Sequence, residues 1–92
     1  YEDDKMLAIH DVAPAAPVHV LLLPKEHTAN VTTADPAIVA YMLGKVKEIA
    51  EKTGIAEKGF RVVINTGEDG GQTVNHLHIH VIGGKALGWP PC

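Results

Sequence analysis

The chain has 92 residues, of which 46% are hydrophobic, and a formal net charge of −3. This length fits one domain, residues 1–92, that buries only about 60% of the surface of its extended chain, so association with a second copy is an expected source of stability. No cluster of lysine and arginine is present, which argues against a nucleic-acid surface, and the apolar runs are far shorter than the ~20 residues that span a bilayer.

The single cysteine and the first residues of the chain indicate its cellular compartment and whether its N-terminus is the natural one. Cys92 is the last residue, so no internal disulfide can form, and a lone thiol is compatible with the reducing cytoplasm. The chain begins at Tyr1 without a methionine and enters a strand pattern after a short acidic lead-in. We therefore expect a cytoplasmic protein whose natural N-terminal segment is missing.

Four strands are predicted in chain order. Met6–His10 and His19–Leu23 are apolar and are separated by a proline-rich turn, and the second is so uniformly apolar that we expect it at the centre of a sheet. Phe60–Asn65 is the third strand. Thr73–Ile82 is the longest, and the glycine-rich turn TGEDGGQ precedes it.

One helix of about five turns is predicted between the second and third strands. Asp35 and Pro36 have the form of an N-cap and a first helical residue, and Gly54 supplies a left-handed stop. The apolar face comprises Ile38, Met42, Val46 and Ile49. Gly44 costs about 1 kcal/mol relative to alanine inside a helix, so it is either merely tolerated or allows the close approach of another backbone, and we favour the close approach.

The element order is thus β-β-α-β-β, with no repeat or linker that would divide the chain. Hairpin-length connections favour an antiparallel meander sheet with the one long helix packed on it. The predicted fold class is α+β.

Three histidines alternate with apolar residues in the run NHLHIHVIGG, namely His76, His78 and His80. On a straight strand the first and last lie ~13 Å apart, whereas zinc ligands must converge to roughly 2 Å from one ion. Three ligands from one strand would therefore be strained. A site with two of these histidines, completed by His10, His19 or His27, stays open as an alternative.

The spacing is better suited to an extended anionic ligand. The middle ring would lie at the reacting atom, and its neighbours would donate hydrogen bonds to charge on either side. Gly70 and Gly71 in the preceding turn allow the backbone to approach a phosphate. Thr73 adds a hydroxyl, but strand parity turns it away from His76 unless a bulge intervenes.

The motif HLHIHV resembles the His-x-His-x-His-x-x motif of the histidine triad superfamily, in which x is apolar. The segments IHDVAPAAPVHVLLLPKEH and VVINTGEDGGQTVNHLHIHVIGG, and the tail WPPC where WPPG is usual, are similar to the Hint branch over essentially the whole chain. The resemblance implies a homodimer whose sheets join, which binds purine nucleoside monophosphates (AMP or GMP) and hydrolyses their phosphoramidates without a metal or cofactor. The alternatives are a Fhit-like dinucleoside polyphosphate hydrolase and a non-catalytic nucleotide-binding module.

The resemblance also implies catalytic roles. His78 would attack the α-phosphorus and form a covalent nucleotidyl-imidazole, which water then releases. His80 would lie near the leaving group, helped by Thr73 in place of a serine. His19 and His76 would buttress the array.

The implied nucleotide contacts come from several segments. Asp11 would bind the ribose hydroxyls, and Trp89 in the tail would lie across the partner's active site. The purine slot would comprise Ile9, Val12 and Leu21, with His10 beside them. The phosphate oxygens would be held by Asn65, Gly71 and Gln72. The family's first segment, which closes over the base, is absent before Tyr1.

Overall fold

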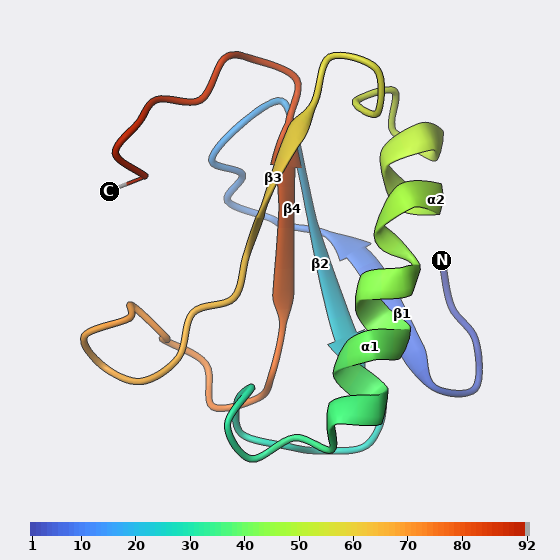
Figure 1. Cartoon of the computed structure of the whole chain (residues 1–92), viewed down its shortest axis with the longest axis vertical. Coiled ribbons are helices and arrows are strands. Elements are labelled where there is room, and N and C mark those ends of the chain that lie inside the picture. The colour runs from blue at the N-terminus through green and yellow to red at the C-terminus, as the bar shows by residue number, and fades with distance from the viewer. Residues whose placement is uncertain (92) are drawn as a thin grey trace.

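A four-stranded antiparallel sheet with the order β1-β2-β4-β3 organises the chain (Figure 1). The structure, a computed structural model, describes residues 1–91, and Cys92 lies outside them. The strands are β1 (Met6–His10), β2 (Val18–Pro24), β3 (Phe60–Val63) and β4 (Ile79–Gly83). The central position of β2 is confirmed. The sheet is not a meander, however, because β4 lies between β2 and β3.

The strand β4 begins six residues later than predicted, at Ile79 instead of Thr73. Its central partner β2 ends at Pro24, which has no amide hydrogen for the ladder. Beyond that point the amide of Leu77 donates to the carbonyl of Thr28 over 2.8 Å. His76 and His78 therefore precede the strand, and His80 is the one triad histidine within it.

The predicted helix is present but broken into α1 (Pro36–Gly44) and α2 (Val46–Lys52). Its N-cap is confirmed, since the Asp35 carboxylate accepts the amide of Ala37 over 2.9 Å. Gly54 follows α2 with a φ of 78° and confirms the left-handed stop. The break lies at Lys45, whose amide donates three residues back to the Met42 carbonyl, which tightens the turn.

The explanation offered for Gly44 was wrong. A Cβ atom built there meets nothing within 4 Å, so no other backbone comes close. Gly44 lies next to the helix break, where its low helix propensity weakens the last turn of α1. Within residues 1–91, neither helix is long and apolar enough to cross a membrane.

Both helices lie on one side of the sheet, where the core forms (Figure 1). The largest fully buried side chains are Met6, Leu22, Met42, Leu77, Ile79 and Val81. The period-two alternation around the triad therefore survives as burial, because the apolar residues between the histidines face the core. The opposite face of the sheet is left for the histidines.

The N-terminal segment is fastened to α1 by one carboxylate. Asp3 accepts hydrogen bonds from the hydroxyl of Tyr41, from the hydroxyl of Tyr1 at 2.8 Å, and from the amides of Lys5 and Met6 at 2.8 and 2.9 Å. The Tyr41 hydrogen bond contributes most to lowering the pKa of Asp3 below its ordinary value. This contact fixes the start of β1 beside the helix.

Candidate active site on the open face of the sheet

One row of side chains crosses the sheet on the face opposite the helices. The strand register places Ile9 beside Leu21, Leu21 beside His80, and His80 beside Val63. Residues paired directly across strands share a sheet face. The row is therefore an apolar strip that contains one imidazole.

His19 and His80 form a hydrogen bond whose direction follows from the neighbours. The amide of Ala15 donates to His19 Nδ1 over 3.0 Å, so the neutral ring carries its proton on Nε2. His19 Nε2 lies 2.8 Å from His80 Nδ1 and donates to it. His80 consequently carries its proton on Nε2, which is left to face a ligand.

His78 has the opposite arrangement. Its Nδ1 lies 2.8 Å from the backbone carbonyl of His76, which can only accept, so the proton is on Nδ1. The Nε2 lone pair of the neutral ring is then available for attack. The rings of His78 and His80 lie 5.0 Å apart between centroids, at 69° to each other. A nucleophilic nitrogen and a donor N–H thus belong to neighbouring rings.

The ring of His76 has different partners. Its Nδ1 lies 2.8 Å from His27 Nδ1, and its Nε2 lies 3.0 Å from the carbonyl oxygen of Pro24. The hydrogen bond between His76 and His78 uses the backbone carbonyl of His76. The three triad histidines are therefore not equivalent ligands on one surface.

The electrostatic environment of His80 favours its neutral form. Burial is the main cause that lowers its pKa below the ordinary value, followed by the nearby His78 and His19, while Asp11 acts in the opposite direction. His80 is therefore an uncharged hydrogen-bond donor in the resting site.

Asp11 lies beside His19 and completes a possible metal-ligand set. Its Oδ2 is 3.5 Å from His19 Nε2, and its Oδ1 accepts the amide of Ala13 over 2.8 Å. The donor atoms of Asp11, His19 and His80 lie within 4.8 Å of one another, and zinc accepts this combination of ligands. A metal site of Asp11, His19 and His80 therefore stays open as an alternative. An ion there would have to replace the proton between His19 and His80. His78 is not part of the set.

The turn before β4 uses most of its polar groups internally. Gln72 donates to the carbonyls of Ala29 (2.7 Å) and Val74 (3.0 Å). The Asn65 amide donates to the carbonyl of Gly70 over 2.7 Å. The amide of Gly71, where φ is 79°, donates to the carbonyl of Glu68. Contacts from the Gly71 amide and the Gln72 side-chain amide to phosphate would require these bonds to exchange, whereas the Asn65 amide keeps a second N–H for a ligand.

Thr73 is exposed and lies outside any strand, so the parity argument that turned it away from the histidines does not apply. It lines a hollow of 500 Å³ together with residues of the same turn and with Asn30. The structure thus places its hydroxyl in the approach to β4 but gives it no contact with His80.

The predicted base and tail residues are exposed. Ile9 is 43% exposed and Val12 fully exposed, and His10 also lies at the surface of β1. Leu21 is partly covered within the cross-strand row. Trp89 is 82% exposed in the C-terminal segment. In the single chain the residues predicted for the purine slot therefore form an open surface instead of a closed slot.

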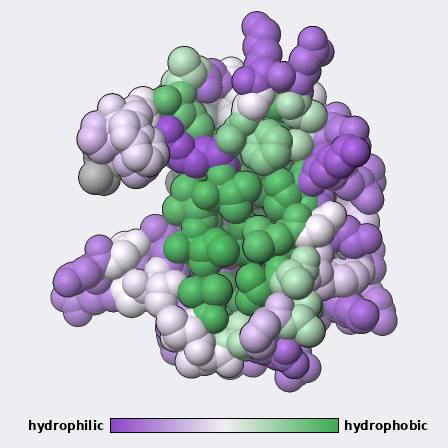
Figure 2. All heavy atoms as spheres, in the orientation of Figure 1, coloured by the Kyte–Doolittle hydropathy of each residue, from purple (hydrophilic) through white to green (hydrophobic). Residues whose placement is uncertain are grey.

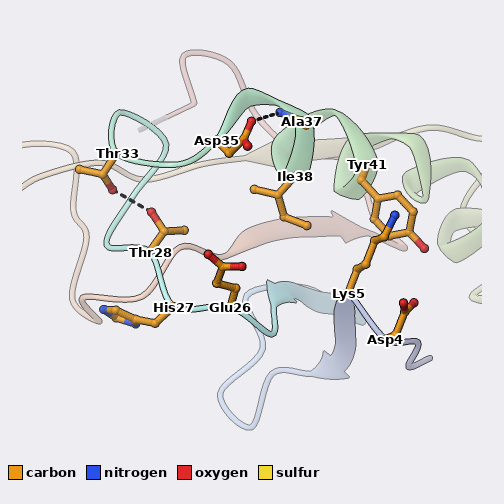
Figure 3. A pocket seen from close by; sticks show the side chains of 10 residues that line it. All are labelled: Asp4, Lys5, Glu26, His27, Thr28, Thr33, Asp35, Ala37, Ile38 and Tyr41. Atoms are coloured by element: carbon orange, nitrogen blue, oxygen red, sulfur yellow. Dashed lines mark hydrogen bonds between the residues drawn. The ribbon is translucent and has the colours of Figure 1, made fainter.

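A second hollow, of 620 Å³, lies between α1 and the ends of β1 and β2 (Figure 3). Three carboxylates and one lysine line it, namely Asp4, Glu26, Asp35 and Lys5. None of the triad histidines does. This hollow is therefore separate from the triad.

The sequence interpretation missed His27, which it left outside the site. The structure brings this residue against His76 across 49 positions of the chain. The available signal was its place three residues after Pro24, just beyond the strand that pairs with β4.

Comparison with known proteins agrees with this arrangement. Residues 1–87 match the HIT domain family. An uncharacterized HIT-like protein of Synechococcus elongatus is 54% identical over 94 residues, which cover 99% of this chain and 82% of the relative. Adenylylsulfatase HINT1 of Arabidopsis thaliana is 44% identical over 96 residues, which cover 99% of this chain and 65% of that protein.

Solved structures give the same result. A HIT family hydrolase from Legionella pneumophila superposes with a TM-score of 0.95 at 38% identity, covering 100% of this chain and 85% of the other. The histidine triad nucleotide-binding protein of Candida albicans superposes with a TM-score of 0.84 at 28% identity, covering 98% and 71%. The chain therefore belongs to the histidine triad (HIT) family, in its Hint branch.

Proposed function

We propose that this protein hydrolyses AMP- or GMP-linked phosphoramidates through a covalent nucleotidyl intermediate on His78. The observation that carries the proposal is the hydrogen bond from His78 Nδ1 to the His76 carbonyl, because it leaves a lone pair on Nε2 beside the N–H of His80. Relatives named as a hydrolase and as a nucleotide-binding protein support this class of reaction.

The reaction divides into two displacements. In the first, His78 Nε2 forms a bond to the α-phosphorus, the phosphorus–nitrogen bond breaks, and the departing amine takes a proton from His80. In the second, water attacks phosphorus and gives a proton back to His80 while the bond to His78 breaks. AMP or GMP and the free amine are the products, and the cycle needs neither metal nor cofactor.

His80 must be protonated before it can act as the acid. It is neutral in the free site, where burial and two neighbouring imidazoles lower its pKa. An anionic phosphate within a few ångströms favours the cationic ring and raises the pKa again. We therefore expect proton uptake at His80 when a substrate phosphate arrives. Nδ1 of His80 then becomes the donor to His19 Nε2, so His19 must carry its own proton on Nδ1, and Asp11 beside the pair stabilises the added charge.

The cross-strand row gives a surface for the rest of the nucleotide. Ile9 and Leu21 provide an apolar floor next to His80, which suits a purine ring. Asp11 lies at the end of the same floor, where its carboxylate can accept hydrogen bonds from two neighbouring ribose hydroxyls. Base and ribose would then extend from the phosphate along β1.

We further propose a cytoplasmic homodimer that joins two sheets along β3. Within residues 1–91 the outer edge of this strand has no partner strand. Figure 2, in the orientation of Figure 1, shows apolar side chains gathered in the middle of the view, over β3 and the adjoining side of the helices. Leu43, Phe60 and Val62 are 43%, 38% and 37% exposed on these elements. A second copy would cover this apolar surface and pair the free edge.

Replacement of His78 by asparagine tests the proposed reaction. The asparagine amide can still donate to the His76 carbonyl but has no nucleophilic nitrogen. We expect turnover of adenosine phosphoramidate to fall by about 10³-fold or more, with AMP binding retained by calorimetry. Acid-quenched wild-type protein should show the mass of a nucleotidyl adduct. Undiminished turnover in His78→Asn, or an adduct on that variant, would contradict the assignment.

Adenylyl sulfate is a second candidate substrate, because a relative at 44% identity is named an adenylylsulfatase. Attack of His78 on its phosphorus would form the same adenylyl intermediate and release sulfate, which departs without a proton. Initial rates on adenosine phosphoramidate, adenylyl sulfate and a dinucleoside triphosphate separate these activities from a Fhit-like hydrolase. Binding without turnover of any of them would identify a non-catalytic module.

A further inference from the structure

Two segments cross beside the triad and are held together by backbone and side-chain hydrogen bonds. One segment, residues 24–29, follows β2, and the other, residues 72–77, leads into β4. The amide of Leu77 donates to Thr28 over 2.8 Å, and the side chain of Gln72 donates to Ala29 over 2.7 Å. The ring of His76 supplies the remaining contacts, with Pro24 and His27.

The proton positions in this crossing are determined by the partners. The Pro24 carbonyl can only accept, so His76 Nε2 carries a proton. The Nδ1 of the neutral His76 ring is then an acceptor, and His27 Nδ1, 2.8 Å away, must be the donor. The two rings lie 4.9 Å apart between centroids, at 45°. Both nitrogens of His76 are thus occupied, the second by a residue outside the triad.

The hydrogen bonds of His76 also affect the proposed nucleophile, His78. The backbone carbonyl of His76 accepts the Nδ1 proton of His78 over 2.8 Å. Without the bond from His27, the proton on Nε2 of His76 could move to Nδ1, and the bond from Nε2 to the Pro24 carbonyl would then be lost. The His76 ring would no longer hold the His76 backbone in place, and the His76 carbonyl would no longer be fixed relative to His78.

We propose that His27 is a positioning residue for the nucleophile, acting through the ring and the carbonyl of His76. His27 touches no reacting atom. It donates one proton that selects the tautomer of His76, and that tautomer holds the carbonyl which selects the tautomer of His78. The proposal rests on the function proposed for His78.

The exposed position of His27 is compatible with this role. Figure 3 shows it at one end of the hollow beside α1, with its ring turned away from Lys5 and Tyr41 at the other end. The ring is therefore directed out of the hollow, and its Nδ1 forms a hydrogen bond with His76. Glu26 precedes it in the same segment, also exposed and lining the hollow, and makes no hydrogen bond to the crossing in the described residues.

Kinetics of the first displacement test the proposal. His27→Ala should slow single-turnover formation of the nucleotidyl adduct about 10-fold while KM changes less than about 2-fold, because the nucleophile is misplaced instead of removed. His27→Asn should recover most of that rate, since its amide can donate from near the position of Nδ1. Glu26→Gln is the matched control and should behave as wild type. An unchanged rate in His27→Ala, or no recovery in His27→Asn, would overturn the role.

Nitrogen-15 NMR of the imidazoles gives a readout that does not depend on activity. In the wild-type protein His78 should be protonated on Nδ1, and in His27→Ala a measurable fraction should shift to protonation on Nε2. Thermal unfolding shows whether His27→Ala is folded. If it is not, the His78 tautomer is compared between His27→Asn and His27→Gln instead. An unshifted His78 tautomer in folded His27→Ala refutes the positioning role. A wild-type protein that forms no adduct refutes the proposed function separately.

Discussion

The rings of His78 and His80 lie 5.0 Å apart, yet their neighbours leave them with different free nitrogens. A backbone carbonyl places the proton of His78 on Nδ1, whereas His19 donates to Nδ1 of His80 and leaves the proton on Nε2. Identical residue types therefore present a lone pair and a donor to the same ligand. At the scale of residues, hydrogen-bond direction assigns the chemistry.

The role of His80 predicts a dependence on the leaving group. An asparagine at position 80 can donate a hydrogen bond but cannot transfer a proton to an amine. For His80→Asn we expect turnover of an alkylamine phosphoramidate of AMP to fall by about 10²-fold to 10⁴-fold, as for loss of a general acid. Hydrolysis of adenylyl sulfate should fall much less, because sulfate needs no proton. Equal losses on both substrates, measured as kcat, would show that His80 acts before the leaving group departs.

At the scale of elements, where a strand ends decides where the histidines lie. β2 ends at Pro24, and the chain before β4 bonds instead to the segment that follows β2. This frees His76 and His78 from the ladder while Leu77 stays in the core. The helix shows a similar local effect: its apolar pattern is continuous, but the helix itself is broken beside Gly44.

The open space around Gly44 predicts that alanine stabilises the protein there. Nothing lies within 4 Å of the added Cβ, and the residue is helical. Gly44→Ala should raise the free energy of unfolding by about 0.5–1 kcal/mol. Gly83→Ala is the matched contrast, since its Cβ would lie 3.0 Å from the side chain of Ile55 and should lower stability. Urea unfolding of both variants checks the pair, and destabilisation by Gly44→Ala would mean that the break at Lys45 needs glycine.

At the scale of the whole molecule, the helices protect one face of the sheet and leave the other for the site. The proposed purine floor is open, and Trp89 is far more exposed than is usual for tryptophan in a folded chain. The free edge belongs to β3, which pairs with the strand that carries His80, and Leu43, Phe60 and Val62 are partly exposed around it. These features are what a second copy would complete.

A lysine at the free edge tests the homodimer. Val62→Lys places a charge on the exposed edge strand, where burial against a second copy would be strongly unfavourable. We expect light scattering to give the mass of a dimer for the wild-type chain and of a monomer for Val62→Lys. Ala37→Lys, an exposed position at the start of α1, should remain dimeric. A wild-type monomer would contradict the proposed assembly.

The features that the sequence determined by itself are local ones. Met6–His10 agrees with β1 residue for residue, and the Asp35 cap, the Gly54 stop and the period-two burial around the triad are confirmed. Capping, left-handed glycine and alternation involve atoms within a few positions of each other, so the residues themselves specify them. The roles assigned to the triad and to the nucleotide contacts stay predictions until the variants are measured.

The tertiary structure alone decided the strand order, the late start of β4 and which nitrogen carries the proton in His76 and His80. These depend on contacts between distant positions, such as the 61 positions that separate His19 from His80. The alternating motif is compatible both with three histidines on one strand face and with the observed arrangement, in which only His80 of the three lies in a strand. The protonated nitrogen of His80 and of His76 depends on a ring or a carbonyl that arrives from another segment, as in the contact of His27 with His76, whereas that of His78 depends on a carbonyl two residues back.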